Sequence, residues 1–117
     1  MICQIKMDTE NIKDFLEVQC VNALDICKIM IRSSIKHYYD TNDKLENIIV
    51  SAKIHKELEK IFTFIHNRTF QIPIDNTLIT ILNIKYDMFV KTLNGDITYK
   101  ELLSYVKQIR FRIESQN

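Results

Sequence analysis

Residues 9–39, TENIKDFLEVQCVNALDICKIMIRSSIKHYY, decide the fold class of this 117-residue chain. Apolar side chains recur through the stretch in steps of four and three, the spacing that places them on one face of an α-helix. No glycine or proline interrupts the pattern. The stretch therefore predicts one long amphipathic helix, or two helices with a bend. The apolar stripe consists of Ile12, Leu16, Cys20, Leu24, Cys27, Ile31, Ile35 and Tyr38, and Phe15, Ala23 and Met30 widen it.

A second helix is expected from about residue 43 to residue 66. It follows a cluster of turn and N-cap residues at positions 40–43. Its apolar positions change phase near Ser51, which indicates either a kink or burial on two sides. The set before the change is Leu45, Ile48, Ile49 and Ala52, and the set after it is Ile54, Leu58, Ile61, Phe62 and Ile65.

A loop should separate this helix from a third one. It covers residues 67–75 and contains the only proline, Pro73, which disfavours helical geometry in the residue before it. Asp75 or Asn76 can then cap a third helix that continues to Leu93. Its apolar side chains are Leu78, Ile79, Ile81, Leu82, Tyr86, Phe89 and Leu93.

The start of the fourth helix has the clearest local signal. Gly95 can adopt the left-handed conformation that closes a helix. Thr98 and Glu101 then have the spacing of a capping box, and Ile97 and Leu102 that of a hydrophobic staple. We therefore expect a fourth helix presenting Leu102, Leu103, Val106, Ile109 and Ile113.

The chain has one glycine and one proline, too few turn residues for a strand-rich fold. The connection between the last two helices is short, so they should pack antiparallel. The sequence predicts an all-α fold, an antiparallel four-helix bundle, in one domain that covers residues 1–117.

Net charge and hydropathy limit the kinds of partner and the cellular location that we expect for this chain. The net charge of +1 favours neither nucleic acid nor anionic lipid as a partner of the whole chain. The first residues turn polar before a signal-peptide core can form, and no later run approaches the roughly 20 apolar residues of a membrane span. We expect a cytoplasmic protein without a transmembrane segment.

Neither cysteines nor histidines suggest a cofactor or metal site. Cys20 and Cys27 are one heptad apart, about 10 Å along a helix and too far for a disulfide, so they are interpreted as reduced core thiols. His55, Glu59 and His66 share one helix face, but about 16 Å separates the two histidines, so one zinc ion cannot bind both. No cofactor and no metal are expected.

One segment suggests catalysis. Arg32, His37 and Tyr39 fit the signature of the HEPN ribonuclease toxins, an arginine, four residues, a histidine, any residue and a tyrosine. Those proteins are also small helical bundles, and the resemblance implies that Arg32 and His37 cleave an RNA phosphodiester. The alternative is that both are solvated residues in the second half of the first helix, where a positive charge favours the helix dipole.

The end of the fourth helix suggests binding. Lys107, Arg110, Phe111 and Arg112 form a basic and partly aromatic tail. The cations can simply complement the helix dipole. Alternatively, the four residues form a contact patch for a protein partner or for the inner membrane surface, with Phe111 as an exposed apolar anchor.

The second half of the chain, about residues 45–113, resembles the immunity proteins for class II bacteriocins. The similarity lies in Ile72 and Pro73, a helix rich in isoleucine and leucine, the turn from Asn94 to Thr98, and a charged amphipathic helix after it. That family consists of small cytosolic four-helix bundles of Gram-positive bacteria. The resemblance implies a non-enzymatic protector that acts on the complex of bacteriocin and membrane-embedded sugar permease through its C-terminal helical hairpin.

Carried onto this chain, the resemblance makes the last helical hairpin and its basic tail the contact surface. Bacteriocin immunity is therefore the expected function, and a HEPN-like toxin is the alternative. A helical adaptor encoded by a virus or phage also fits the composition. The sequence leaves open whether the chain is a monomer or a homodimer.

Overall fold

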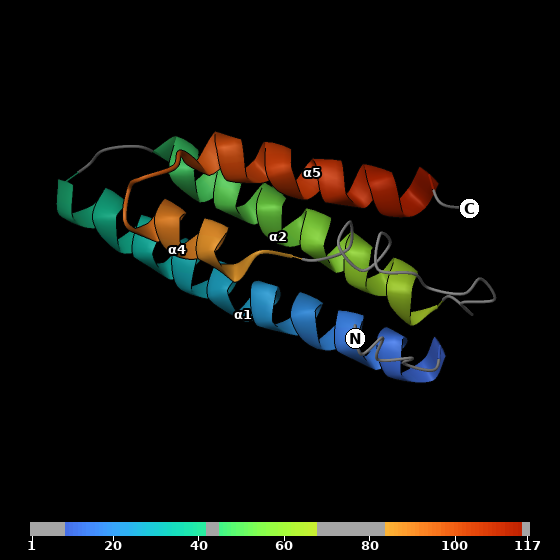
Figure 1. The fold of residues 1–117 in the computed structure, drawn as a ribbon. Coiled ribbons are helices and arrows are strands. Elements are labelled where there is room, and N and C mark those ends of the chain that lie inside the picture. The colour runs from blue at the N-terminus through green and yellow to red at the C-terminus, as the bar shows by residue number, and fades with distance from the viewer. Residues whose placement is uncertain (1–8, 42–44, 68–83, 116–117) are drawn as a thin grey trace, which may run out of the picture.

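The computed structural model describes residues 9–41, 45–67 and 84–115. These residues form four α-helices and no strand: α1 (Thr9–Thr41), α2 (Leu45–His66), α4 (Tyr86–Leu93) and α5 (Tyr99–Ser115) (Figure 1). The predicted all-α bundle is confirmed for this part of the chain.

Helix α1 runs without a break for 33 residues, which corresponds to about 50 Å. Of the two possibilities that its periodicity left open, the single helix is the correct one. Phe15 and Ile35 were assigned to the apolar stripe but are exposed, and the hydroxyl residue Ser34 takes a buried place instead. The buried side chains are Leu16, Cys20, Ala23, Ile26, Cys27, Met30 and Ser34.

Helix α2 is also continuous and passes through Ser51, which is fully buried. Leu45 and Ile49, which belong to the apolar set before the phase change, are exposed. Helix α2 packs against α1 on one flank and against α5 on the other. Neither a kink nor burial on two sides explains the change of phase, because the helix is continuous and its buried side chains form one stripe, which the set before the change does not join.

The third helix was predicted to continue without a break to Leu93, but α4 begins only at Tyr86. The expected continuous helix is wrong at Ile84 and Lys85, which precede α4, and Lys85 has extended φ and ψ angles of −74° and 109°. The N–H of Lys85 donates a 3.0 Å hydrogen bond to Tyr105 Oη, and that of Ile84 a 3.4 Å bond to Gln19 Oε1. These bonds to α5 and α1 replace the helical ones. Apart from Asn67, which forms a turn after α2, the predicted loop lies outside the described residues, as does the Asp75 or Asn76 cap.

The turn between α4 and α5 follows the prediction. Gly95 has φ of +84°, in the left-handed region. Its N–H donates to the carbonyl of Thr92, and the N–H of Asp96 donates to that of Lys91. The Glu101 N–H donates a 3.1 Å hydrogen bond to Thr98 Oγ1, so Thr98 caps α5 as expected.

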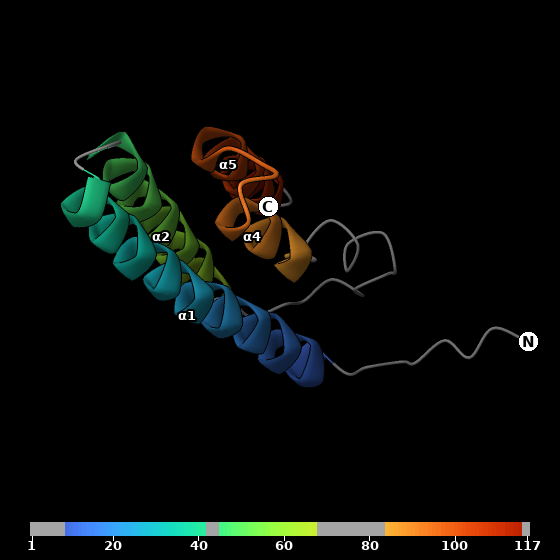
Figure 2. The same cartoon turned by 90° about the vertical axis from the view of Figure 1, so that its left-hand side faces the viewer.

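Each helix is antiparallel to its neighbour in sequence, and the two hairpins pack side by side. Lys100 Nζ lies 2.6 Å from Glu46 Oε1 near the first turns of α5 and α2, and further along both helices Arg110 pairs with Glu57. Because both pairs advance in the same direction, α5 runs parallel to α2. Figure 2 shows α4 and α5 on one side of the α1–α2 pair, so the other side of that pair faces away from them.

One cluster of buried apolar side chains unites the four helices. Phe89 of α4 is fully buried in it, together with Cys27 of α1, Leu58 of α2 and Val106 of α5. Since all four helices contribute, the outward faces are left to solvent or to partners.

Candidate functional site

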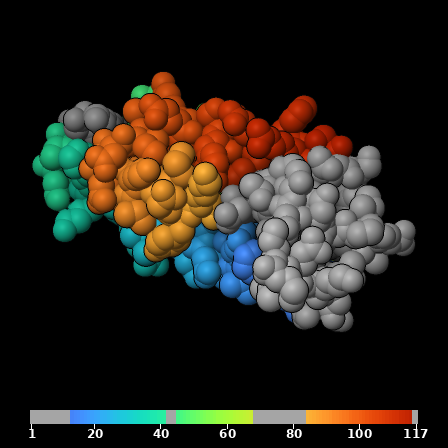
Figure 3. Space-filling model, viewed as in Figure 1, coloured from blue at the N-terminus to red at the C-terminus, as the bar shows by residue number. Residues whose placement is uncertain are grey.

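The outward face of α5 carries the residues that the sequence assigned to partner binding. Leu102, Val106 and Ile109 are buried, and at about 100° per residue their stripe turns Lys107 and Phe111 away from the core. Helix α5 lies at the surface in the space-filling view, where it is the red segment (Figure 3). The capped start of α5 and its buried stripe thus set the orientation of this face.

Phe111 is the most exposed phenylalanine in the described residues, at 74%. Burying such a side chain stabilises a complex by about 1.5–3 kcal/mol. Phe111 lines a shallow groove of about 570 Å³ along α5, together with the cations Lys100, Lys107, Arg110 and Arg112. This face therefore combines an aromatic ring with positive charge.

Arg110 is already engaged within the fold. Its guanidinium pairs with Glu57 of α2 and lies 3.2 Å from Glu114 Oε1. Desolvation lowers the pKa of Arg110, but Glu57 and Glu114 raise it more, so the net shift of the pKa is upward. Arg110 consequently links α5 to α2, and its side chain is only 30% exposed.

The other cations of the face divide into two kinds. Lys100 is paired with Glu46, and this contact raises the pKa of Lys100 and lowers that of Glu46, mainly through their hydrogen bond. Lys107 and Arg112 are exposed and form no ion pair with any residue that the structure describes. These two positive charges are available to a partner.

The candidate catalytic residues Arg32, His37 and Tyr39 do not come together. All three lie on the exposed surface of one continuous helix, α1. Five helical steps place Arg32 and His37 about 140° apart around its axis. Tyr39 is 81% exposed, and its ring packs edge-on against Tyr38 with 6.0 Å between centroids.

His37 does line a polar hollow of about 380 Å³ at one end of the bundle, and Arg32 does not. Asn47 of α2 and Tyr99 of α5 line the same hollow. Sequence reasoning missed this hollow because its residues come from all four described helices and from the turn between α4 and α5. No carboxylate, lysine, arginine, cysteine or second histidine lines it, so His37 has no partner there of the kind that general acid–base catalysis commonly uses.

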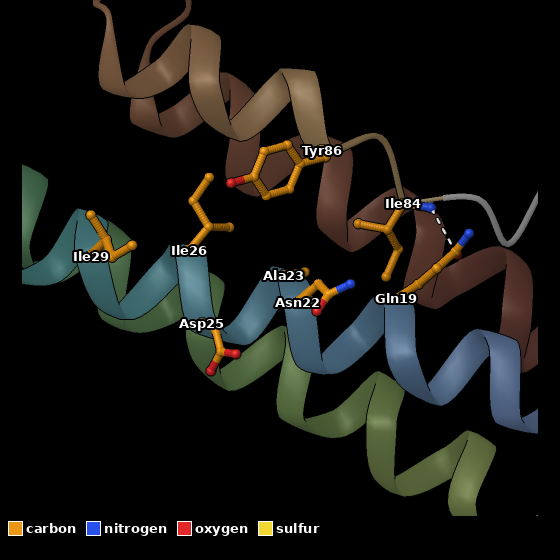
Figure 4. Close-up of a pocket in the computed structure, with 8 residues that line it drawn as sticks. All are labelled: Gln19, Asn22, Ala23, Asp25, Ile26, Ile29, Ile84 and Tyr86. Carbon is orange, nitrogen blue, oxygen red and sulfur yellow. Dashed lines mark hydrogen bonds between the residues drawn. The ribbon is translucent and has the colours of Figure 1, made fainter.

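A second hollow of about 400 Å³ lies between α1 and the start of α4 (Figure 4). Ile26, Ile84 and Tyr86 gather at it, and the Ile84 N–H bond to Gln19 crosses beside it. Asp25 is the one charged residue drawn, and it points away from Tyr86 (Figure 4). Apart from Asp25, the residues that line this hollow offer only apolar contact, amide groups and a phenol.

The two described thiols are buried, as the sequence indicated, and two histidines lie beside carboxylates. Cys20 and Cys27 are buried free thiols, and burial raises the pKa of each to about 12, with Glu17 adding to the effect on Cys20. His55 bonds to Glu59 on its own helix, and His66 Nδ1 lies 3.1 Å from Glu17 Oε1. Within residues 9–41, 45–67 and 84–115, no three potential ligands gather as a metal site requires.

Comparison with known proteins identifies no relative of this chain. No protein-family model matches the chain, and neither a curated protein nor a solved structure is significantly similar to it. None of the described helices is both long enough and apolar enough to cross a bilayer.

Proposed function

We propose that this protein is a non-enzymatic binding protein whose contact surface is the outward face of α5. The observation that carries the proposal is the exposed ring of Phe111, which lies in a groove with four cations. Large aromatic side chains and arginines supply most of the binding energy at protein interfaces. Lys107 and Arg112 can meet acidic groups at the rim of such an interface, where charge mainly speeds association.

The arrangement of the alternative catalytic residues supports binding over RNA cleavage. A general base and an anion-stabilising cation must reach the same phosphodiester. Arg32 and His37 diverge on one rigid helix, and only His37 lines a hollow. The α5 face requires no such convergence, because a docking surface acts through shape and charge.

The narrower form of the proposal is bacteriocin immunity, and it rests on the resemblance of residues 45–113 to that family. The partner would then be a complex of a class II bacteriocin with its membrane-embedded permease, met from the cytoplasmic side. The contact would come from the α4–α5 hairpin, with Phe111, Lys107 and Arg112 on the side away from the core.

The test is a resistance assay. The chain is expressed in a bacteriocin-sensitive strain, which is then challenged with a panel of class II peptides. We expect resistance to one peptide, lost in the double variant Phe111→Ala with Lys107→Ala. Truncation at residue 107 is a poor test, because Ile109 and Ile113 are buried and their removal would damage the core.

Tyr39→Ala is the matched control, since Tyr39 is an equally exposed aromatic residue on α1 and its loss should leave resistance intact. Both variants should keep the circular dichroism spectrum of the parent. Sensitivity to every peptide in the panel contradicts the immunity proposal. Full resistance of the double variant contradicts the assignment of the α5 face.

A further inference from the structure

The outward face of α1 has an ordered charge pattern. Asp14 and Asp25 lie in its first half, and Lys28, Arg32 and Lys36 lie in its second half. All five side chains are exposed. At about 100° per residue they fall within an arc of about 80°, so one face of the helix is acidic at one end and basic at the other.

These charges have no partners in the fold that the structure describes. None of the five takes part in an ion pair there, although α1 does use Glu17 to bind His66. The helix dipole favours cations only near the last turn of a helix, and Lys28 lies more than three turns before the end of α1. The pattern therefore needs another explanation.

Apolar side chains accompany the charges. Val18, Val21 and Ile35 are 57%, 43% and 37% exposed, and helical geometry places them on the same side of α1, away from the buried stripe. Because these side chains are exposed, no described helix covers this face, and Figure 2 shows α4 and α5 on one side only of the α1–α2 pair. A face with valine and isoleucine between opposite charges resembles one half of a helix–helix interface.

We infer that a second copy of this chain packs antiparallel against this face of α1. A two-fold axis between residues 26 and 27 places Asp25 of each copy opposite Lys28 of the other, and Val18 opposite Ile35. Asp14 and Lys36 then lie within one helical turn of the same level. A parallel arrangement would instead oppose like charges, so the antiparallel dimer is the one that this sequence favours.

The choice of a second copy follows from the symmetry of the pattern. A two-fold interface must be complementary to itself, because the same patch serves both subunits. The α1 face satisfies this requirement, since its acidic half matches its own basic half after the rotation. The inference does not depend on the function of α5, whose outward face remains free in this dimer.

Charge reversal tests the dimer. One variant carries Lys28→Glu with Lys36→Glu, and another carries Asp14→Lys with Asp25→Lys. Analytical ultracentrifugation of the whole chain should show a dimer, whose dissociation constant rises at least about tenfold in either variant. Higher salt should also weaken the parent dimer, because its ion pairs lie at the surface.

Two further samples exclude unfolding and general charge effects. An equimolar mixture of the two variants should dimerise again, and so should a chain with all four substitutions, in which both pairs of opposed charges are inverted but still complementary. Lys53→Glu with Lys56→Glu changes the net charge equally on α2 and should leave the dimer intact. A monomeric parent chain, half-reversed variants that dimerise like the parent, or a mixture that stays monomeric would each overturn the inference.

Discussion

Helix α2 meets its two neighbours through different chemistry. Toward α1 it presents Ser51, whose hydroxyl donates a 2.7 Å hydrogen bond to the carbonyl of Asn47 in its own helix. Ser34 of α1 does the same with Met30, and the two hydroxyls lie 3.5 Å apart. Toward α5, by contrast, α2 presents the carboxylate of Glu57, which pairs with Arg110.

The difference shows which polar groups can specify a fold. A buried hydroxyl that bonds to its own helix is satisfied wherever that helix packs. Buried Glu57 is satisfied by Arg110 of α5, with Lys60 at 3.8 Å as a weaker neighbour. Because only three residues separate α1 from α2 in the sequence, their pairing is favoured by the chain itself. Helix α5 lies much further along the chain, so its register against α2 depends more on the Glu57–Arg110 pair than on the length of a connecting loop.

The largest effect should come from the apolar core that both interfaces share. Ile54 of α2 is fully buried, so Ile54→Ala leaves a cavity and should lower the free energy of unfolding by about 2–5 kcal/mol. Urea denaturation, monitored by circular dichroism, measures this change in the free energy of unfolding. Ile49→Ala, on the exposed side of the same helix, is the control and should change stability by less than about 0.5 kcal/mol. Equal effects would contradict the orientation of α2.

Breaking the charged interface should have the next largest effect. Glu57→Ala leaves Arg110 without its partner on α2 and should cost about 1–3 kcal/mol of unfolding free energy. Glu114→Ala removes the more exposed partner and should cost less. In the double variant Glu57→Met with Arg110→Met, part of the loss should be recovered. If the loss of stability in the double variant equals the sum of the losses in the Glu57→Met and Arg110→Met single variants, the two residues do not stabilise the α2–α5 contact through each other.

Alkaline pH probes the thiol on the α1–α2 side. The pKa of Cys27 is raised from 9.0 to about 12 by burial. In the pH range between these values only the unfolded state releases the thiol proton. The contribution of this thiol to stability should therefore be complete below pH 9.0 and fall above it, by about 1.4 kcal/mol for each pH unit. Denaturation curves across this range test the slope, which Cys27→Ala should reduce. An unchanged slope contradicts burial of the thiol.

The smallest effect is expected at the hydroxyl pair. Ser51→Ala removes a bond within one helix and leaves no buried charge, so we expect a loss below about 1 kcal/mol. The same denaturation experiment measures it, with Ile54→Ala as the reference. A loss as large as that of Ile54→Ala would show that the contact between Ser34 and Ser51 joins the helices more strongly than its 3.5 Å separation indicates.

The sequence by itself determined the helices and much of the surface. Spacing of apolar residues predicted α1, α2 and α5, because a helix must repeat its buried positions every three or four residues. The Thr98 cap and the Gly95 turn were also predictable, since both depend on residues close in sequence. The exposure of Phe111, Lys107 and Arg112 followed from their place opposite the apolar stripe of α5.

Only the tertiary structure decided which helix flanks are covered. Periodicity could not show that Ser51 would be buried and Ile49 exposed, because that depends on where α1 and α5 lie around α2. Nor could it show that Arg110, assigned with Phe111 to partner binding, pairs with Glu57, which is far away in the sequence. The extended backbone at Ile84 and Lys85 likewise follows hydrogen bonds to Gln19 and Tyr105. Contacts between distant residues are made by the packing of whole helices, and local sequence patterns do not contain them.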